Sequence, residues 1–360
     1  MITQQLTKYK PQKLAILVTL ALLLLGCLNL AFKPVSWTVA PGEWAEGVRA
    51  EATRNEADRG PKTSPAPAAA SNRAVNSSPP QTPALAQPVQ PDQPGIEHVL
   101  IISIDGLRPD ALDRAQTPVL DSLRAQGVYC PFAQTIKISV TLPSHASMLG
   151  GMVPEKHGIL WGLPYIGWPG MNGPTLFNVA HEAGLSTAMV FGKEKLNYLV
   201  LSNSVDKLFG VDAHDPEVKE RAVEFIQAGL PDVMFVHFPD TDRVGHEYGW
   251  MSDNQLHAVT YVDGLIGDIL AALEGGGYLE STLLIVTSDH GGHGFGHGDD
   301  SPVDRTIPWL AVGPGVPRGE ILYRPINTYD TAATVLHALE LPIPEIWDGQ
   351  PVLEIFRRNG

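Results

Sequence analysis

The chain is poor in cysteine and in basic residues. Two cysteines among 360 residues exclude a framework of disulfide bonds. The formal net charge of −14 argues against a basic surface, so no nucleic-acid binding is expected. Cys130 stands in a predicted strand, where we expect a buried and inert thiol.

An apolar run without charge covers residues 14–32 and follows Lys8, Lys10 and Lys13. Its length is about that of a helix crossing a bilayer, and the lysines would hold the N-terminus in the cytoplasm. Residues 1–37 are therefore predicted to be a cytoplasmic tail and signal anchor, with the rest periplasmic or extracellular. Leu24-Leu25-Gly26-Cys27 leaves a lipoprotein signal open, and a buried core helix is the third reading.

Composition then changes twice along the chain. Residues 38–95 are rich in Pro, Ala, Ser, Gln and Asn and carry too few apolar side chains for a core. We predict a disordered, semi-extended linker there. Residues 96–360 are predicted to form the folded domain.

Apolar runs with strand character alternate with helical segments in this domain. This alternation predicts an α/β sandwich with a mostly parallel central sheet flanked by helices. The predicted strands cover 98–104, 128–136, a stretch that follows Gly184 and ends at Phe191, 233–238, 283–287 and 309–312. The predicted helices cover 110–126, 175–183, 216–228, 254–273 and 328–339.

Polar residues follow several predicted strands, where function collects in parallel sheets. Asp105-Gly106 follows the first strand, although a loop or helix-capping aspartate would look the same. Asp289, His290, His293 and His297 follow a later strand among five glycines. Imidazole and carboxylate ligands without thiolates suit zinc; the alternative is a solvated histidine loop.

A second cluster follows the strand at 233–238. Asp242 and His246 are four residues apart, so on a helical turn they would face the same way and could hold one ion together. Asp240 is a competing ligand, and a surface group of acids is the alternative reading.

Thr141-Leu142-Pro143-Ser144-His145 supplies a hydroxyl near a helix predicted to begin at Pro143. A hydroxyl at a helix N-terminus, beside a metal ion that lowers its pKa, is suited to nucleophilic attack on phosphorus. A threonine that only caps the helix would need no such role.

Taken in order, these motifs resemble the nucleotide pyrophosphatase/phosphodiesterase family (type I phosphodiesterases) of the alkaline phosphatase superfamily. The resemblance covers roughly residues 96–357. The matching segments are Asp105-Gly106, Thr141-Leu142-Pro143-Ser144-His145, Pro154-Glu155-Lys156-His157-Gly158-Ile159, Asp242-Arg243-Val244-Gly245-His246 and Ser288-Asp289-His290-Gly291.

The resemblance implies an alkaline phosphatase-like hydrolase with two zinc ions per chain, other divalent metals being the alternative. It would cleave phosphodiester or pyrophosphate bonds of small, nucleotide-type phosphate esters through a covalent intermediate on Thr141, which lies beside both ions. The implied ligands are Asp242, His246 and His297 for one ion and Asp105, Asp289 and His290 for the other, with His293 as the alternative to His297.

Two positions depart from the family pattern. Gly162 stands where the family supplies an asparagine that holds a phosphate oxygen, so another donor must serve. Ser144 replaces the asparagine after the proline of the nucleophile motif. Four loop side chains are predicted to line an apolar pocket and to stack on a nucleotide base: Trp161, Tyr165, Ile166 and Trp168. The alternative is that they only pack together as a cap.

Other activities of the superfamily compete with this interpretation. A sulfatase needs cysteine or serine where this chain has Thr141. Phosphomonoesterases and phosphonate hydrolases remain alternatives, and a monoester enzyme would need extra donors for a third charged oxygen. A surface binding module without catalysis is the least favoured alternative, because every implied ligand is present.

Overall fold

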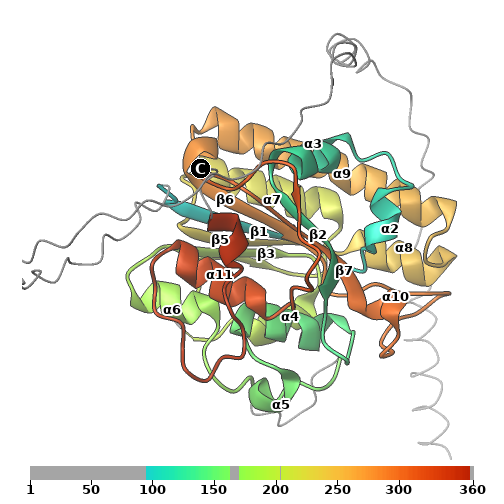
Figure 1. The fold of residues 1–360 in the computed structure, drawn as a ribbon, viewed down its shortest axis with the longest axis horizontal. Coiled ribbons are helices and arrows are strands. Elements are labelled where there is room, and N and C mark those ends of the chain that lie inside the picture. The colour runs from blue at the N-terminus through green and yellow to red at the C-terminus, as the bar shows by residue number, and fades with distance from the viewer. Residues whose placement is uncertain (1–94, 163–169, 203, 357–360) are drawn as a thin grey trace, which may run out of the picture. The chain divides into compact units, whose positions relative to one another are not determined.

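The computed structural model describes residues 95–162, 170–202 and 204–356 (Figure 1). The predicted membrane segment and all but the last residue of the predicted linker lie outside these residues. The proposed division at residues 37 and 95 therefore stays a prediction.

One eight-stranded sheet organises the described domain, in the order β4-β3-β5-β1-β6-β7-β2-β8. β7 pairs antiparallel with β6 and β2, and the other pairings are parallel. The mostly parallel sheet predicted from the sequence is thus confirmed. The strands are β1 His98–Ile104, β2 Val128–Gln134, β3 Thr187–Phe191, β4 Lys207–Gly210, β5 Val233–Phe238, β6 Thr282–Thr287, β7 Thr306–Val312 and β8 Glu320–Ile321.

Helices cover both faces of the sheet, because the central strands are apolar on both sides. In β1, Leu100 and Ile102 belong to one core cluster while Val99 and Ile101 belong to the other. One face carries α4 Thr141–Gly150, α6 Leu176–Glu182 and α11 Asp330–Ala338, and the opposite face carries α2, α3, α7 Asp215–Gln227 and α9 Asp253–Gly275 (Figure 1). Shorter helices are α5 Pro154–His157, α8 Asp240–Tyr248 and α10 Pro302–Arg305.

The prediction of a single helix at 110–126 is wrong. Two helices occupy this stretch, α2 Pro109–Leu112 and α3 Pro118–Gln126. Pro118 lacks an N–H and restricts Thr117, so the chain starts a new helix there. The Asp263 carboxylate of α9 accepts hydrogen bonds from the backbone N–H groups of Val119 (3.1 Å) and Leu120 (2.8 Å), which satisfies the first turn of α3.

α9 is the one helix in the described part of the chain with the length and apolarity to cross a membrane. Its apolar face is already used, since Val259, Val262, Ile266 and Ile269 are buried in the core cluster on one side of the sheet. α9 is therefore a core helix of this domain.

Candidate functional site

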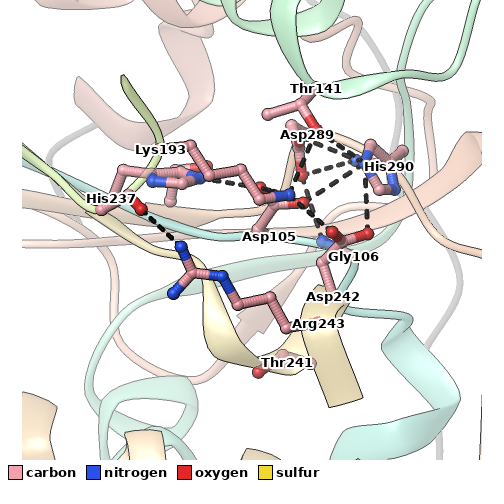
Figure 2. A network of polar contacts seen from close by, with 12 residues as sticks. Asp105, Gly106, Thr141, Lys193, His237, Thr241, Asp242, Arg243, Asp289 and His290 are labelled. Atoms are coloured by element: carbon pink, nitrogen blue, oxygen red, sulfur yellow. Dashed lines mark hydrogen bonds and ion pairs between the residues drawn. The ribbon is translucent and has the colours of Figure 1, made fainter. Parts of the chain in front are cut away.

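The candidate site lies at the carboxyl ends of four neighbouring strands, β3, β5, β1 and β6. Asp105 follows β1, Lys193 follows β3, Asp242 lies in α8 directly after β5, and Asp289 and His290 follow β6. Because parallel strands end at the same edge, residues far apart in the sequence meet here. Figure 2 shows these side chains converging, with Thr141 entering from α4.

An inner group of buried side chains consists of Asp105, Asp289 and His290. His290 Nε2 lies 3.3 Å from both Asp105 Oδ1 and Asp289 Oδ2, and 3.9 Å from Asp242 Oδ1. The other oxygen of Asp289 accepts hydrogen bonds from the N–H groups of Gly106 (3.1 Å) and His290 (3.0 Å). Asp289 is thereby fixed with one oxygen turned toward the site.

An outer group consists of Asp242, His246 and His297. His246 Nε2 and His297 Nε2 each lie 3.4 Å from Asp242 Oδ1. Asp242 and His246 share one face of α8, as their spacing of four predicts. The rings of His290 and His297 are stacked with centroids 3.7 Å apart, so the two groups are adjacent.

Each of the three histidines is oriented by a backbone carbonyl. His290 Nδ1–H donates to Gly291 O (2.8 Å), His246 Nδ1–H to Phe295 O (2.9 Å) and His297 Nδ1–H to Ser139 O (2.8 Å). This fixes the tautomer and leaves Nε2 of each ring as a lone-pair donor facing the site.

The donor atoms fit divalent cations. Asp105 Oδ1, Asp242 Oδ1 and Asp289 Oδ2 are buried without a hydrogen-bond partner. Two ligand atoms bound to a tetrahedral zinc at ordinary bond lengths lie about 3.4 Å apart, close to the 3.3–3.4 Å between these oxygens and the histidine nitrogens. Nitrogen and carboxylate ligands without thiolate suit zinc.

The ligand atoms divide somewhat differently from the expected sets. Asp242, His246 and His297 offer atoms within 4.8 Å of one another, and so do Asp105, Asp242 and His290. Asp242 therefore lies between the two groups, while Asp289 Oδ2 lies 3.3 Å from His290 Nε2.

His293 and Asp240 lie apart from both groups. His293 Nδ1 donates to Asp304 Oδ1 (2.8 Å), so His297 rather than His293 stands beside Asp242. Asp240 pairs with His214 and Arg243 and accepts from the N–H of Asp215. Neither side chain is available at the site in this arrangement.

Thr141 is buried at the junction of the inner group and Lys193. Its Oγ1 lies 3.5 Å from His290 Nε2 and accepts a hydrogen bond from Lys193 Nζ at 3.4 Å. α4 begins at Thr141 and not at Pro143, because Val140 is the extended residue that precedes the helix. The hydroxyl therefore stands in the first turn, where the helix dipole favours negative charge.

Charges in the inner group are strongly coupled. Burial opposes ionisation of Asp105, but the charge of Lys193 and the adjacent rings of His237 and His290 outweigh it and hold the pKa of Asp105 well below its usual value. Burial likewise opposes protonation of His290, yet Asp289 and Asp105 raise its pKa to about 9. Burial and the charge of His290 lower the pKa of His297 to about 4. The site thus concentrates negative charge that a cation would neutralise.

Sequence reasoning missed several residues that contact the predicted ones. Lys193 Nζ lies 2.7 Å from Asp105 Oδ2 and 2.5 Å from Asp242 Oδ2. His237 Nε2 donates to Asp105 Oδ2 at 2.8 Å. His145 Nδ1 donates to Thr141 O at 2.8 Å. The usable signals were a lysine two residues after a strand and a lone histidine inside the apolar strand β5.

The predicted aromatic pocket is described only in part. Trp161, one residue before the end of the described range 95–162, is about half exposed. Tyr165, Ile166 and Trp168 lie outside the described residues, so base stacking stays a prediction.

Comparison with known proteins places the chain in a family. The sequence model of the type I phosphodiesterase / nucleotide pyrophosphatase family matches residues 99–161 and 169–308, more than half of the chain. The class that the structure and the family match define is an alkaline phosphatase-like α/β sandwich with clustered carboxylates and histidines at the strand ends. The chain belongs to the type I phosphodiesterase/nucleotide pyrophosphatase family.

Curated relatives agree with this assignment. The chain is 28% identical over 215 residues to an uncharacterized pyrophosphatase/phosphodiesterase of Schizosaccharomyces pombe, covering 54% of this chain and 44% of that one. It is 26% identical over 212 residues to the bis(5'-adenosyl)-triphosphatase enpp4 of Mus musculus, covering 54% of this chain and 46% of that one. The aligned part thus spans about half the length of these relatives.

Solved structures share the fold at low sequence identity. A murine ectonucleotide pyrophosphatase/phosphodiesterase 5, an inactive variant in complex with AMP, superposes with a TM-score of 0.61 at 15% identity, covering 72% of this chain and 100% of that one. A 2-O GAG sulfatase gives the same TM-score and identity, covering 75% and 76%. The fold alone therefore does not separate phosphate from sulfate esters.

Proposed function

We propose that the protein hydrolyses phosphodiester or pyrophosphate bonds of nucleotide-type substrates, with two divalent metal ions and a covalent intermediate on Thr141. The observation that carries the proposal is the place of Thr141 Oγ1, 3.5 Å from His290 Nε2 and buried against the inner group. Family membership supports the same reaction class.

Two zinc ions are the proposed cofactors. Asp242, His246 and His297 would hold one ion, and Asp105, Asp289 and His290 the other, with Asp242 close to both sets. When bound, such a pair polarises the phosphoryl oxygens, neutralises developing charge and lowers the pKa of a nearby hydroxyl.

The chain's own residues then carry out two displacements. Thr141 Oγ1 attacks phosphorus and loses its proton to solvent, while the bond to the leaving oxygen breaks and that oxygen keeps the electron pair and takes a proton from water. Water next attacks the phosphorus of the threonyl ester, and Oγ1 leaves with its electron pair and regains a proton. The hydrogen bond from His145 to Thr141 O holds the nucleophile's backbone during both steps.

A phosphomonoesterase is the second candidate, because one observation favours it. A monoester carries a third charged oxygen that needs a further donor, and the Lys193 ammonium lies 3.4 Å from Thr141 Oγ1. A phosphonate hydrolase would use the same donor.

Membrane attachment is proposed from the sequence alone. Residues 1–37 would anchor the chain, residues 38–95 would space the domain from the bilayer, and residues 96–360 would work in the periplasm or outside the cell. Release of the protein from membranes by alkaline carbonate alone, without detergent, would contradict the anchor.

A pair of chromogenic esters tests the proposed reaction. We would purify the full chain in detergent, remove metals with a chelator, and compare hydrolysis of bis-p-nitrophenyl phosphate and p-nitrophenyl phosphate before and after adding zinc. We expect zinc to restore a preference for the diester. A monoester preference would move the assignment to a phosphatase, and an absence of zinc-dependent turnover of either ester would refute the mechanism.

A further inference from the structure

Lys193 is the one ammonium group that reaches the centre of the described site. It stands directly before η2 Glu194–Leu199 and is separated from β3 by Gly192. Its side chain is 11% exposed, and Nζ contacts Asp105, Asp242 and Thr141. A lysine buried to this degree is uncommon unless it is paired.

The partners of Lys193 are the groups that the proposed reaction uses. Asp105 and Asp242 come from the two proposed metal sets, and Thr141 carries the attacking oxygen. The Lys193 ammonium therefore lies between the two carboxylates and beside the nucleophile.

Ion binding by Asp105 and Asp242 would compete with Lys193 for their oxygens. Thr141 Oγ1 is then the remaining partner of Nζ among its present contacts. The lysine stem has four rotatable carbons, so Nζ can follow a group that becomes attached to Oγ1. A phosphoryl group bonded to Oγ1 surrounds that atom with negatively charged oxygens.

Residue 162, the position where a phosphate donor is expected, is a glycine. Gly162 has no side chain, and a Cβ built there would meet nothing within 4 Å. A nonbridging phosphate oxygen therefore receives no side-chain donor from this position. Lys193 Nζ, 3.4 Å from Thr141 Oγ1, is a cationic donor that could take the place of a side chain at residue 162.

We infer that Lys193 donates directly to a nonbridging oxygen of the phosphoryl group during its transfer to and from Thr141. This inference rests on the proposed function. Lys193 is then a catalytic residue that stabilises charge in the transition state. The alternative is a structural role as the counter-ion of two buried carboxylates.

The test replaces Lys193 with methionine and with arginine in the zinc-loaded full chain. Lys219→Met is the matched control, because it removes a lysine whose ion pair with Asp268 on the surface contributes little. We expect Lys193→Met to lower kcat/KM for bis-p-nitrophenyl phosphate about 100-fold, the usual loss for one transition-state donor. Lys219→Met should keep the wild-type rate.

Binding of inorganic phosphate, measured by calorimetry, is the readout that does not depend on turnover. Loss of a charge-assisted hydrogen bond should weaken phosphate binding about tenfold or more in Lys193→Met. Lys193→Arg, which keeps the charge, should recover part of it. Metal analysis and thermal unfolding of each variant establish that two zinc ions and the fold are retained.

The outcomes separate this inference from the proposed function. A wild-type chain without zinc-dependent turnover would refute the proposed function itself. An active wild type with a folded, zinc-loaded Lys193→Met variant of unchanged rate and phosphate affinity would overturn the role of Lys193 alone. If Lys193→Met does not fold, unchanged phosphate affinity and rate in Lys193→Ala would overturn the inference, and a matching loss would support it.

If neither neutral variant folds, Gly162→Asn in the wild type decides. A Cβ at position 162 would meet nothing within 4 Å. If Lys193 already donates to the phosphoryl oxygen, Gly162→Asn should change kcat/KM less than threefold. A gain of about 100-fold, the value of one donor, would show that no donor was present and would overturn the inference.

Discussion

The inner and outer groups of candidate ligands differ most in their exposure to water. Asp105, Asp289 and His290 are fully buried, while the His246 side chain is 46% exposed and that of His297 is 10% exposed. The inner ligands extend from strand ends, whereas the outer ones belong to α8 and a glycine loop. We conclude that the inner ion would be held by a rigid frame and the outer ion by parts that adjust more easily.

Removal of the Thr141 hydroxyl, which lies beside the inner group, should have the largest effect. Thr141→Ala is expected to lower kcat for bis-p-nitrophenyl phosphate by about 10⁴-fold or more, as when a covalent nucleophile is deleted. Thr141→Ser, which keeps a hydroxyl, should retain far more activity. Equal rates for the alanine variant and wild type, at equal zinc content, would eliminate the covalent mechanism.

Loss of the inner histidine should come next. His290→Ala removes a nitrogen within 3.3 Å of two carboxylate oxygens and leaves those oxygens buried without it. We expect one zinc ion fewer per chain, a loss of about 10³-fold in activity, and no recovery in excess zinc. Atomic absorption and initial rates measure both quantities, and full recovery in excess zinc would contradict the rigid inner frame.

Loss of the outer histidine should be milder and reversible. His246→Ala leaves Asp242 and His297 in place and opens the position to water. Zinc affinity should fall by at least about 10- to 100-fold, the loss found when the hydrogen-bond partner of a metal ligand is removed. Activity should return as zinc is raised into the millimolar range. An effect as severe and irreversible as that of His290→Ala would remove the distinction between the groups.

A histidine outside both groups should give the smallest effect. His157 is buried, donates from Nε2 to Ser147 and accepts from the N–H of Ile159. Burial lowers the pKa of His157 to about 4, against about 6.5 in an unfolded chain. The unfolded state therefore binds more protons between these values, and stability should fall as pH drops through that window, by at most about 3 kcal/mol.

Urea unfolding at pH 7 and pH 5 checks this sign. The wild type should lose more stability than His157→Asn, whose amide oxygen can still accept from Ile159. An identical pH dependence in the two proteins would exclude His157 as a contributor.

The sequence predicted the parts of this site that follow from strand periodicity. Asp105 was predicted because it directly follows an apolar run, and Asp289 because it lies two residues after another. The strands at 98–104 and 233–238 were placed correctly. Helix spacing likewise paired Asp242 with His246. These features are local, so one sequence contains enough information to predict them.

Other features depend on how distant elements meet. The place of Asp242 between the two groups depends on the direction in which α8 leaves β5, and no local pattern specifies that direction. Lys193 was overlooked because a lysine after a strand is ordinarily solvated. The helix predicted at 110–126 failed because Pro118 was read inside a helix and not as its first residue.

A zinc titration of the full chain tests the two-metal site most directly. Metal-stripped protein in detergent would be titrated with zinc while bound metal is counted and hydrolysis of bis-p-nitrophenyl phosphate is followed. The account predicts two zinc ions per chain, and full activity only once both are bound. Full activity with one ion, or two bound ions without hydrolysis of any phosphate ester, would contradict it.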